Sequence, residues 1–556
     1  MHDSLELEAD YHGTDYVVAE KITDEVIIQR TDQKAVLKQN NTQSPQKRKD
    51  KSPIPFLILL MELQLSSIPL LFSSFLFVCM LIKVAAKTTT KLLAMSPAPN
   101  LPPGPWKLPF IGNMHHLIGG SQVHCMLRDL SQKYGPLMHL QLGEISTIVV
   151  SSPEMATEVV KTHDILFAQR PYHIAADILS YNFTDIISSP YGEYWRQLRK
   201  ICIMEILSAK RVQTFRSIRE EEVSDLIESI FREAKSTINL SKKISSLTFA
   251  TIGRAAFGKK SKDQEAFIST MHEVAKVATG VTIKWLQKIC GIESKLLQLH
   301  KKFDEILESI VNEHKQRKMR TIPESGSDQE EAKEDLVDVL LRIQKHGDLG
   351  IPLTDNNIKA VISDMFSAGG ETSSTTIEWA MSEMLKNRRV MKMAQNEGLH
   401  ELKYLKSVIK ETLRLHPPVP LLLPRACRKH CKINGFQIPV KTSVLVSVWS
   451  IGRDTKYCTD AEKFQPERFM DSSIDFKGTD FQYLPFGAGR RMCPGIAFAQ
   501  PNVELPLAHL LYHFDWELPN GMKKEELDMT EVLGMTIRRK HDLYLIPIPY
   551  HPSPVE

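Results

Sequence analysis

The chain has 556 residues and a formal net charge of +4, with 70 Lys and Arg against 66 Asp and Glu. Nothing in this balance points to nucleic acid as a partner, and 42% hydrophobic residues is the content of an ordinary globular protein. The 8 cysteines are dispersed along the chain, which argues against a disulfide scaffold and suits a reducing compartment.

An apolar stretch near the N-terminus is long enough for a membrane anchor. Residues 67–82 carry no charge and are mostly apolar, and with their flanks they approach the ~20 residues that cross a bilayer as a helix. Lys83, Lys87 and Lys91 follow, with no small-residue cleavage site before them. We therefore expect a single transmembrane signal anchor over 61–95, with the rest of the chain in the cytosol. A buried helix of a soluble protein is the alternative.

The segments on either side of this anchor differ from a folded domain. Residues 1–60 begin with six acids and no Lys or Arg in the first twenty positions, and their basic cluster at 47–51 competes with the later lysines in setting the membrane orientation. A start at Met61 removes that conflict, so we expect 1–60 to be a gene-prediction extension or a disordered tail. After the anchor, 96–110 contains Leu-Pro-Pro-Gly-Pro, which predicts a stiff, proline-rich hinge before the domain over 111–556.

Helical periodicity dominates the body of the chain, and strand patterns are confined to two short regions. Alternating apolar residues predict a hairpin at 136–150 and a second β region at 433–448. Amphipathic helices are predicted from the 190s to the 250s and at 264–279, 295–318, 334–345, 355–390 and 496–514. The predicted fold class is mainly α with small β regions, in one domain.

Two side chains of the first long helix are typical of a site for a carboxylate. Trp195 and Arg199 stand four residues apart and therefore lie on one helix face. An indole N–H beside a guanidinium suits a buried carboxylate of a ligand. A solvated basic face is the alternative.

Two adjacent glycines interrupt the helix predicted at 355–390. Gly369 and Gly370 each cost a helix about 1 kcal/mol relative to alanine, so another group is expected to approach the backbone there. Glu371 and Thr372 follow, and an acid next to a hydroxyl could relay protons to bound oxygen. The alternative is a harmless bend in which the hydroxyls bond to helix carbonyls.

A cysteine in a glycine-rich loop stands just before the last long helix. Cys493 opens onto a helix N-terminus, where free N–H groups and the helix dipole favour a thiolate that can be an axial ligand of iron. Gly489 and Gly495 would let the loop lie flat against a planar ligand, Arg491 could pair with a carboxylate of that ligand, and Phe486 could shield the sulfur. A buried structural cysteine is the alternative.

The pattern Phe-x-x-Gly-x-Arg-x-Cys-x-Gly over 486–495, with all five fixed positions present, resembles the heme-binding loop of the cytochrome P-450 superfamily. The likeness runs from Met61 to Tyr550. Phrases such as those at 371–379 and 502–507 look like the plant microsomal group, and in particular its branch of terpenoid-oxidising enzymes such as sesquiterpene and diterpene hydroxylases.

The resemblance implies a cytochrome P-450 fold after a transmembrane helix, with 111–556 as a heme-thiolate catalytic domain. It implies heme b (iron protoporphyrin IX) as the cofactor. The residues that it assigns are Cys493 to the iron, Trp195, Arg199, Phe486, Gly489, Arg491 and Gly495 to heme binding, and Glu371 and Thr372 to proton delivery. A Glu-x-x-Arg helix and a Pro-Glu-Arg-Phe segment further imply a structural triad of Glu411, Arg414 and Arg468, which as an isolated pattern would be surface electrostatics.

The function implied is a monooxygenase in the endoplasmic reticulum membrane, single-pass, with its catalytic domain in the cytosol. NADPH-cytochrome P-450 reductase would supply electrons, O2 would supply one oxygen atom, and an apolar, terpenoid substrate would accept it at a C–H bond. Cations near Arg490 could dock the reductase. On the family pattern the substrate pocket is lined by 174–187, 365–372, 419–423 and 533–536, which are largely apolar.

Two stretches are shorter than the family pattern, near 282–285 and at 394–398. The second lies just ahead of Glu411 and Arg414, so that a real deletion there would put heme retention in doubt. The shortened stretches leave open a catalytically inactive heme-binding protein, and a different reaction is open independently of them. That reaction is the one of a heme-thiolate isomerase or dehydratase that needs no reductase.

Overall fold

A computed structural model of the chain describes residues 100–117, 122–259, 264–278, 291–320, 334–347, 352–397, 399, 402–534 and 536–550. The tail at 1–60, the predicted anchor at 61–95 and the shortened stretch near 282–285 lie outside the described residues. Among the helices that the structure does describe, none is both long enough and apolar enough to span a bilayer.

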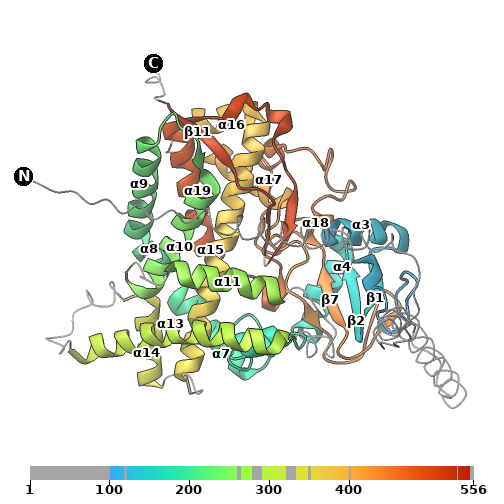
Figure 1. Cartoon of the computed structure of the whole chain (residues 1–556). Coiled ribbons are helices and arrows are strands. Elements are labelled where there is room, and N and C mark those ends of the chain that lie inside the picture. Colours follow the sequence, from blue (N-terminus) through green and yellow to red (C-terminus); the bar gives the residue numbers. More distant parts are fainter. Residues whose placement is uncertain are drawn as a thin grey trace, which may run out of the picture. The chain divides into compact units, whose positions relative to one another are not determined.

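Helices make up most of the described chain, which confirms the predicted fold class (Figure 1). The α-helices are α3 (Val123–Tyr134), α4 (Pro153–Thr157), α5 (Asp164–Phe167), α6 (Ile174–Leu179), α7 (Glu193–Ile201), α8 (Ala209–Thr214), α9 (Arg216–Arg232), α10 (Leu240–Phe257), α11 (Gln264–Ala278), α13 (Ile292–Arg320), α14 (Leu336–His346), α15 (Asp355–Lys386), α16 (Arg388–Asn396), α17 (Lys403–Leu415), α18 (Val448–Ile451) and α19 (Ile496–His513). The helix predicted at 355–390 is split, because Asn387 leaves helical geometry between α15 and α16.

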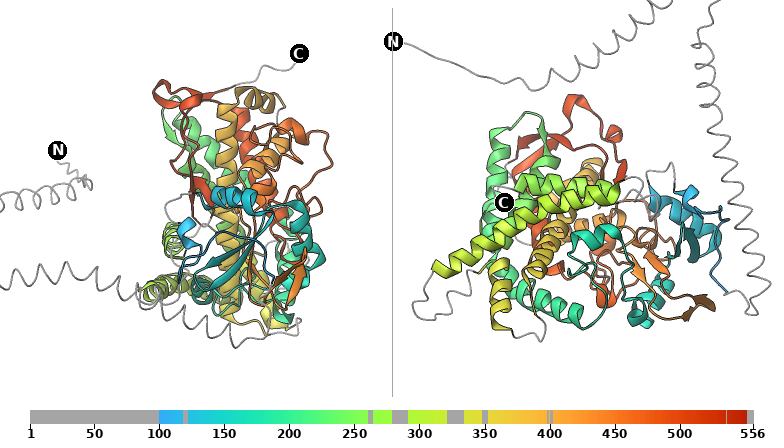
Figure 2. Two further views of the ribbon diagram at one scale, coloured as in Figure 1. Left: turned by 90° about the vertical axis from the view of Figure 1, so that its right-hand side faces the viewer. Right: turned by 60° about the horizontal axis from the view of Figure 1, so that its bottom comes forward.

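The long central helix α15 organises the helical part. It begins at Thr354, whose hydroxyl and the side chain of Asn357 form a reciprocal capping box that satisfies free backbone groups. Its residues are buried along most of their length, and α10, α17 and α19 pack against it. Figures 1 and 2 show α15 running through the middle of these helices.

The glycine pair of α15 has a packing explanation. A Cβ atom on Gly370 would lie 2.5 Å from the ring of Phe249 in α10, which is too close for any side chain. On Gly369 it would meet Ile252 of the same helix at 3.3 Å. The group that the sequence predicted to approach the backbone is therefore Phe249 of α10.

Strands form four small sheets. They are β1 (Leu137–Leu142), β2 (Ile145–Val150), β3 (Ile238–Asn239), β4 (Arg425–Ala426), β5 (Cys431–Ile433), β6 (Phe436–Ile438), β7 (Ser443–Val446), β8 (Phe514–Glu517), β9 (Glu531–Leu533), β10 (Ile537–Arg539) and β11 (Tyr544–Pro549). Antiparallel pairing of β1 with β2 and the strands β5 to β7 confirm both predicted β regions. The sheet β1-β2-β7-β4 lies beside the helical part, on the right in Figure 1.

The apolar core follows α15. One cluster packs its C-terminal half against α9, α17 and α19, and another packs its N-terminal half against α10, α13 and α14. The loop at 486–495 ends where α19 begins, as predicted, with Gly495 at the N-cap position. The fold thus holds the cysteine loop and α15 in fixed positions around one cavity.

Candidate active site

One cavity is lined by both the cysteine loop and α15. Most of its walls are apolar, and they include Ile186, Ile187, Leu207, Ile252, Met365, Val419, Leu422, Leu423, Phe476, Phe486, Ile496 and Phe498. The predicted lining stretches 365–372 and 419–423 are confirmed, whereas only the end of 174–187 contributes. The described residues of 533–536 do not line the cavity, because Thr536 turns to Glu371.

The thiol of Cys493 faces this cavity. The side chain of Cys493 has a large accessible area. That area faces the cavity. Burial raises the pKa of the Cys493 thiol, and the N–H of Gly495 and the charge of Arg199 oppose that shift. A metal cation bound at the sulfur would favour the thiolate.

Hydrogen bonds and packing fix the loop around that sulfur. The N–H of Cys493 donates to the carbonyl of Phe486 (3.0 Å), whose ring also lines the cavity. Gly489 has φ +68°, and a Cβ there would lie 2.3 Å from the carbonyl oxygen of Val160. Close contact with the neighbouring π-helical segment η2 (Glu158–Thr162) therefore accounts for glycine at position 489, and its predicted contact with a planar ligand stays a prediction.

Arginine side chains gather on one part of the cavity wall. Arg170, Arg199, Arg425 and Arg491 all line it, and the carbonyl oxygens of neighbouring loops accept most of their hydrogen bonds. Burial, together with repulsion by Arg425 and Arg199, lowers the pKa of Arg491 to about 9. The wall carries more positive charge than its acidic neighbours offset.

Asp164 at the start of α5 is the acid that connects this wall to the cysteine loop. It is buried, and its Oδ1 accepts a hydrogen bond from Arg425 (3.2 Å). Its Oδ2 accepts from the N–H of Arg490 (3.0 Å) and from the guanidinium of Arg490 (2.9 Å). The sequence analysis missed Asp164, Arg170 and Arg425, because no local pattern marks them.

Trp195 lies beside the arginines of this wall, and its predicted part in heme binding stays a prediction. Its indole N–H donates to the carbonyl of Ile186 (3.0 Å), so this N–H is taken by the backbone. The guanidinium of Arg491 lies 4.0 Å from the Trp195 ring centre, and that of Arg199 lies 5.4 Å from it. Trp195 therefore supports the two arginines through cation–π contacts.

These donors fit a heme. A thiol in a mostly apolar cavity can be an axial ligand of its iron. The surplus of buried guanidinium groups, with the depressed pKa of Arg491, calls for an anion, and carboxylates at one edge of a flat apolar ligand would supply it. Arg199, Arg425 and Arg491 line the cavity where they could hold such carboxylates.

Glu371 and Thr372 point in different directions. Thr372 lines the cavity, and its hydroxyl donates to the carbonyl of Ala368 (2.6 Å), which is the bond that the structural alternative predicted. Glu371 is buried away from the cavity lining, and its Oε1 accepts a hydrogen bond from Thr536 (2.8 Å). The side chains of Glu371 and Thr372 therefore bond different partners, although the two residues are adjacent in sequence.

The three residues of the predicted triad contact one another. Glu411 is completely buried, and its carboxylate accepts from Arg414 Nε and Nη2 (both 2.8 Å) and from Arg468 Nε (3.0 Å). The short connection before α17 does not disturb it, because Glu397 closes the gap by accepting from the N–H groups of Tyr404 (2.6 Å) and Leu405 (3.0 Å). The structure gives no support to a displaced Glu411.

Asp364 of α15 is another cavity residue that the sequence did not reveal. Its Oδ2 accepts from the N–H groups of Ile186 (2.8 Å) and Ile187 (3.2 Å), which fixes two lining residues. Burial and the nearby Asp185 raise the pKa of Asp364 well above its usual range, and burial raises the pKa of Asp185 to about 6. The Asp364 side chain is therefore already bonded within the wall.

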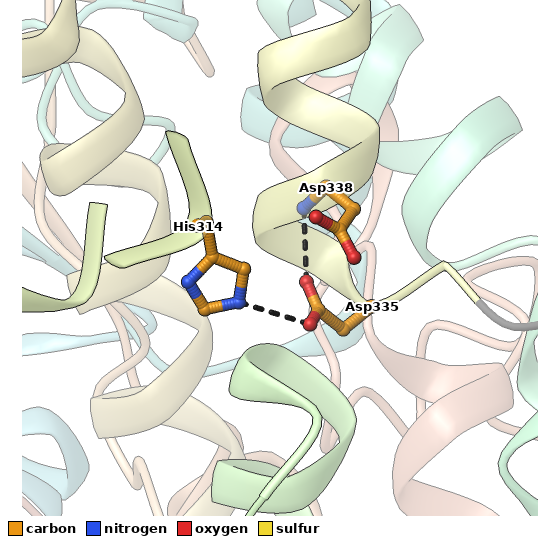
Figure 3. A group of neighbouring side chains, drawn as sticks. All are labelled: His314, Asp335 and Asp338. Carbon is orange, nitrogen blue, oxygen red and sulfur yellow. Dashed lines mark hydrogen bonds and ion pairs between the residues drawn. The ribbon is translucent and has the colours of Figure 1, made fainter. Parts of the chain in front are cut away.

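A second group of acids and a histidine lies between α13 and α14 (Figure 3). Asp335 caps α14 through the N–H of Asp338 (2.9 Å) and accepts from His314 Nε2 (3.0 Å). Arg317 bonds both carboxylates, at 3.0 and 2.6 Å. Burial opposes charge on His314, but the hydrogen bond to Asp335 outweighs it and raises the pKa of His314. Arg317 bonds both carboxylates and His314 bonds one of them, so hydrogen bonds and ion pairs hold the group together.

Comparison with known proteins places the chain among relatives of similar length. The family model described as cytochrome P450 matches residues 102–544. Premnaspirodiene oxygenase of Hyoscyamus muticus is 51% identical over 479 residues, which cover 82% of this chain and 94% of that protein. Tabersonine 16-hydroxylase 1 of Catharanthus roseus is 52% identical over 508 residues, which cover 87% of this chain and 98% of that protein.

The fold has a counterpart among solved structures. A zebrafish cytochrome P450 with progesterone superposes with a TM-score of 0.66 at 24% sequence identity, covering 77% of this chain and 99% of that one. The match of the family model over most of the chain and the two plant relatives agree with the cysteine loop and its arginine wall. The chain is therefore a member of the cytochrome P450 family of heme-thiolate monooxygenases.

Proposed function

We propose that the protein inserts one atom of O2 into a C–H bond of an apolar, terpenoid substrate, with electrons from NADPH delivered by a membrane-bound cytochrome P-450 reductase. The observation that carries this proposal is the single cavity in which a thiol, buried arginines and apolar walls meet. The cofactor proposed is heme b, with Cys493 as ligand of its iron and Arg199, Arg425 and Arg491 on its carboxylates.

Each part of the site has a stated task in this proposal. The bound heme supplies the activation of O2 for insertion into a C–H bond. The carbonyl of Phe486 holds the backbone of Cys493, so that the sulfur keeps its place. Trp195 and Asp164 hold the arginines of the wall. The triad of Glu411, Arg414 and Arg468 is proposed to brace the region behind the loop.

Protons must reach the cavity for O2 to be reduced, and α15 carries the proposed carriers. Thr372 presents its hydroxyl to the cavity wall. Glu371 precedes it and is buried, so a proton carried on its carboxyl group would pass to the cavity by way of the Thr372 hydroxyl. We propose this pair as the last step of the proton path.

A neutral hydrocarbon-like substrate fits the walls better than a basic one. An amine inside an apolar cavity needs a carboxylate partner, and Asp364, the acidic residue among the cavity-lining residues of the described chain, already binds the N–H groups of Ile186 and Ile187. The names of two relatives point to both kinds of substrate, since one is a premnaspirodiene oxygenase and another a tabersonine 16-hydroxylase. The apolar lining of the cavity favours a neutral terpenoid substrate over a basic one.

The test is a paired incubation. The full chain is expressed in yeast microsomes with a plant cytochrome P-450 reductase and offered premnaspirodiene and tabersonine in separate reactions with NADPH. We expect an oxygenated product, heavier by one oxygen atom, from the terpene and little from the alkaloid. Turnover of tabersonine alone would contradict the substrate class. Product without NADPH from a hydroperoxide would instead favour the isomerase or dehydratase, and no turnover with a normal heme spectrum would favour the inactive protein.

The cellular location is proposed on the sequence alone. We propose that 61–95 anchors the protein in the endoplasmic reticulum membrane as a single span, with 111–556 in the cytosol and 96–110 as the hinge. Alkaline carbonate extraction of microsomes should leave the chain in the pellet, and deletion of 61–95 should release it. Release of the intact chain by carbonate would contradict the anchor.

A further inference from the structure

The position of Glu371 depends on a residue outside the cavity. Thr536, between β9 and β10, is buried and donates its hydroxyl hydrogen to Oε1 of Glu371 (2.8 Å). Thr375, one turn further along α15, lies 3.4 Å from the same hydroxyl. We propose that Thr536 is a positioning residue that holds the Glu371 carboxyl group away from the cavity. This inference rests on the proposed function, in which Glu371 carries protons.

Helix geometry explains why the acid needs a separate anchor. Successive residues of an α-helix turn by about 100°, so residues four apart share a face and the neighbouring residue points about a quarter-turn away. Thr372 and Thr376 share the face that lines the cavity. Glu371 and Thr375 share the next face, which meets Thr536. To deliver a proton, the Glu371 side chain must leave the face on which Thr536 binds it.

The anchor itself is held firmly. The indole N–H of Trp379 donates to the carbonyl of Ile537 (3.2 Å), and Arg539 donates to the hydroxyl of Ser382 (3.0 Å). Two bonds from β10 to α15 thus keep Thr536 in register with Glu371. A third bond runs from the N–H of Ile537 to the carbonyl of Pro418 (2.9 Å), a residue of the cavity wall. Thr536 therefore connects the proposed proton carrier to the wall.

Release of the Glu371 side chain from Thr536 should change the fate of reduced oxygen in a way that can be measured. One hydrogen bond shifts the ratio of two conformers by up to about tenfold. Without Thr536 as donor, the carboxyl group would turn into the cavity and deliver protons even when no substrate is bound. Reduced oxygen would then leave as hydrogen peroxide, with both electrons from NADPH and both protons from solvent.

The experiment compares Thr536→Val with Thr536→Ser. Valine has the shape of threonine without the donor, and serine keeps the donor. In the reductase-coupled holoenzyme without substrate, we expect Thr536→Val to form peroxide about tenfold faster than wild type, and Thr536→Ser to stay near the wild-type rate. Thr375→Val is the matched control, because it removes the hydroxyl beside Thr536 but keeps Thr536 as the donor to Glu371, and it should leave the rate near the wild-type value.

Two further measurements separate positioning from general damage. In a Glu371→Gln background, Thr536→Val should have no further effect on peroxide formation, because the effect passes through the carboxyl group. A crystal structure of the Thr536→Val holoenzyme should show the Glu371 side chain turned into the cavity. An unmoved side chain, or an equal rise in peroxide in the Glu371→Gln background, would overturn the proposal.

These results are distinguishable from failure of the proposed function. If wild type with reductase consumed no NADPH, the proposed function would fail. The crystal structure of Thr536→Val would still decide whether Thr536 positions Glu371, because that readout needs no turnover. Unfolding midpoints of both Thr536 variants, measured at equal heme content, are expected to agree with wild type within a few degrees.

Discussion

Removal of the Glu411 carboxylate should destabilise the protein more than the loss of an ordinary ion pair. Glu411 is fully buried, and it accepts hydrogen bonds from Arg414, Arg468 and the N–H of Gln465 (2.8 Å). In Glu411→Gln the amide keeps the size of the side chain but has no charge. Two arginines, one of them buried, would then lack their counter-ion.

The expected cost follows from that burial. Breaking a buried ion network by removing one partner costs about 3–5 kcal/mol, because the remaining charge is left uncompensated in a medium of low polarity. Glu220→Gln provides the matched control. Glu220 pairs with Arg216 on the surface at 2.7 Å, where both side chains are about half exposed or more, and the loss there should be below about 0.5 kcal/mol.

The assay is urea unfolding followed by far-ultraviolet circular dichroism, with all variants at equal heme content. Glu411→Gln should lower the unfolding midpoint strongly and should also lose heme during purification, whereas Glu220→Gln should match wild type. A free energy change below about 1 kcal/mol for Glu411→Gln, or one equal to the control, would refute the reasoning that the triad is a buried, mutually dependent unit.

Three further predictions concern packing, pH and heme retention. Gly370→Ala should destabilise by about 1–3 kcal/mol, because the new methyl group would press on Phe249. The pKa of His314 is raised from 6.5 by its hydrogen bond to Asp335 against the effect of burial, so its stabilisation is complete below that pH and is lost as the pH rises through the raised pKa. Arg425→Met should release heme to apomyoglobin about tenfold faster, because one hydrogen bond to a charged group is lost.

Each of these three predictions has a control variant or a result that would contradict it. Gly369→Ala, whose methyl group would meet the flexible end of Ile252, should be tolerated. Unfolding midpoints of wild type and His314→Gln should converge as the pH rises from 6.5 through the raised pKa of His314, and parallel curves would contradict the role of the pair. An unchanged heme release rate in Arg425→Met would contradict the assignment of the arginine wall.

The parts of the site that could be predicted are those with a local signal. Cys493 stands in a loop of five fixed positions, and Glu411 and Arg414 lie three apart on one helix, so short-range spacing was enough to find them. The helices of the body were also found, because the 3.6-residue period is a local property. The end of α15 was placed too late, since only the tertiary structure shows that Asn387 leaves the helix.

The parts that were missed depend on contacts between distant segments. Asp164 and Arg425 are 261 residues apart in sequence, and Thr536 and Glu371 are 165 apart. No pattern within either segment marks such a pair. The glycine pair could be predicted only in part. The sequence indicated a close approach at Gly370, but it did not show that Phe249 makes this contact.

The central claim is that the sulfur of Cys493 binds the iron of a heme. The most direct measurement is the absorption spectrum of the purified, reduced protein under carbon monoxide, for wild type and Cys493→Ser. The account predicts the red-shifted Soret band of thiolate ligation in wild type and its absence in the serine variant. A wild-type spectrum without that band, or an identical band in Cys493→Ser, would contradict it.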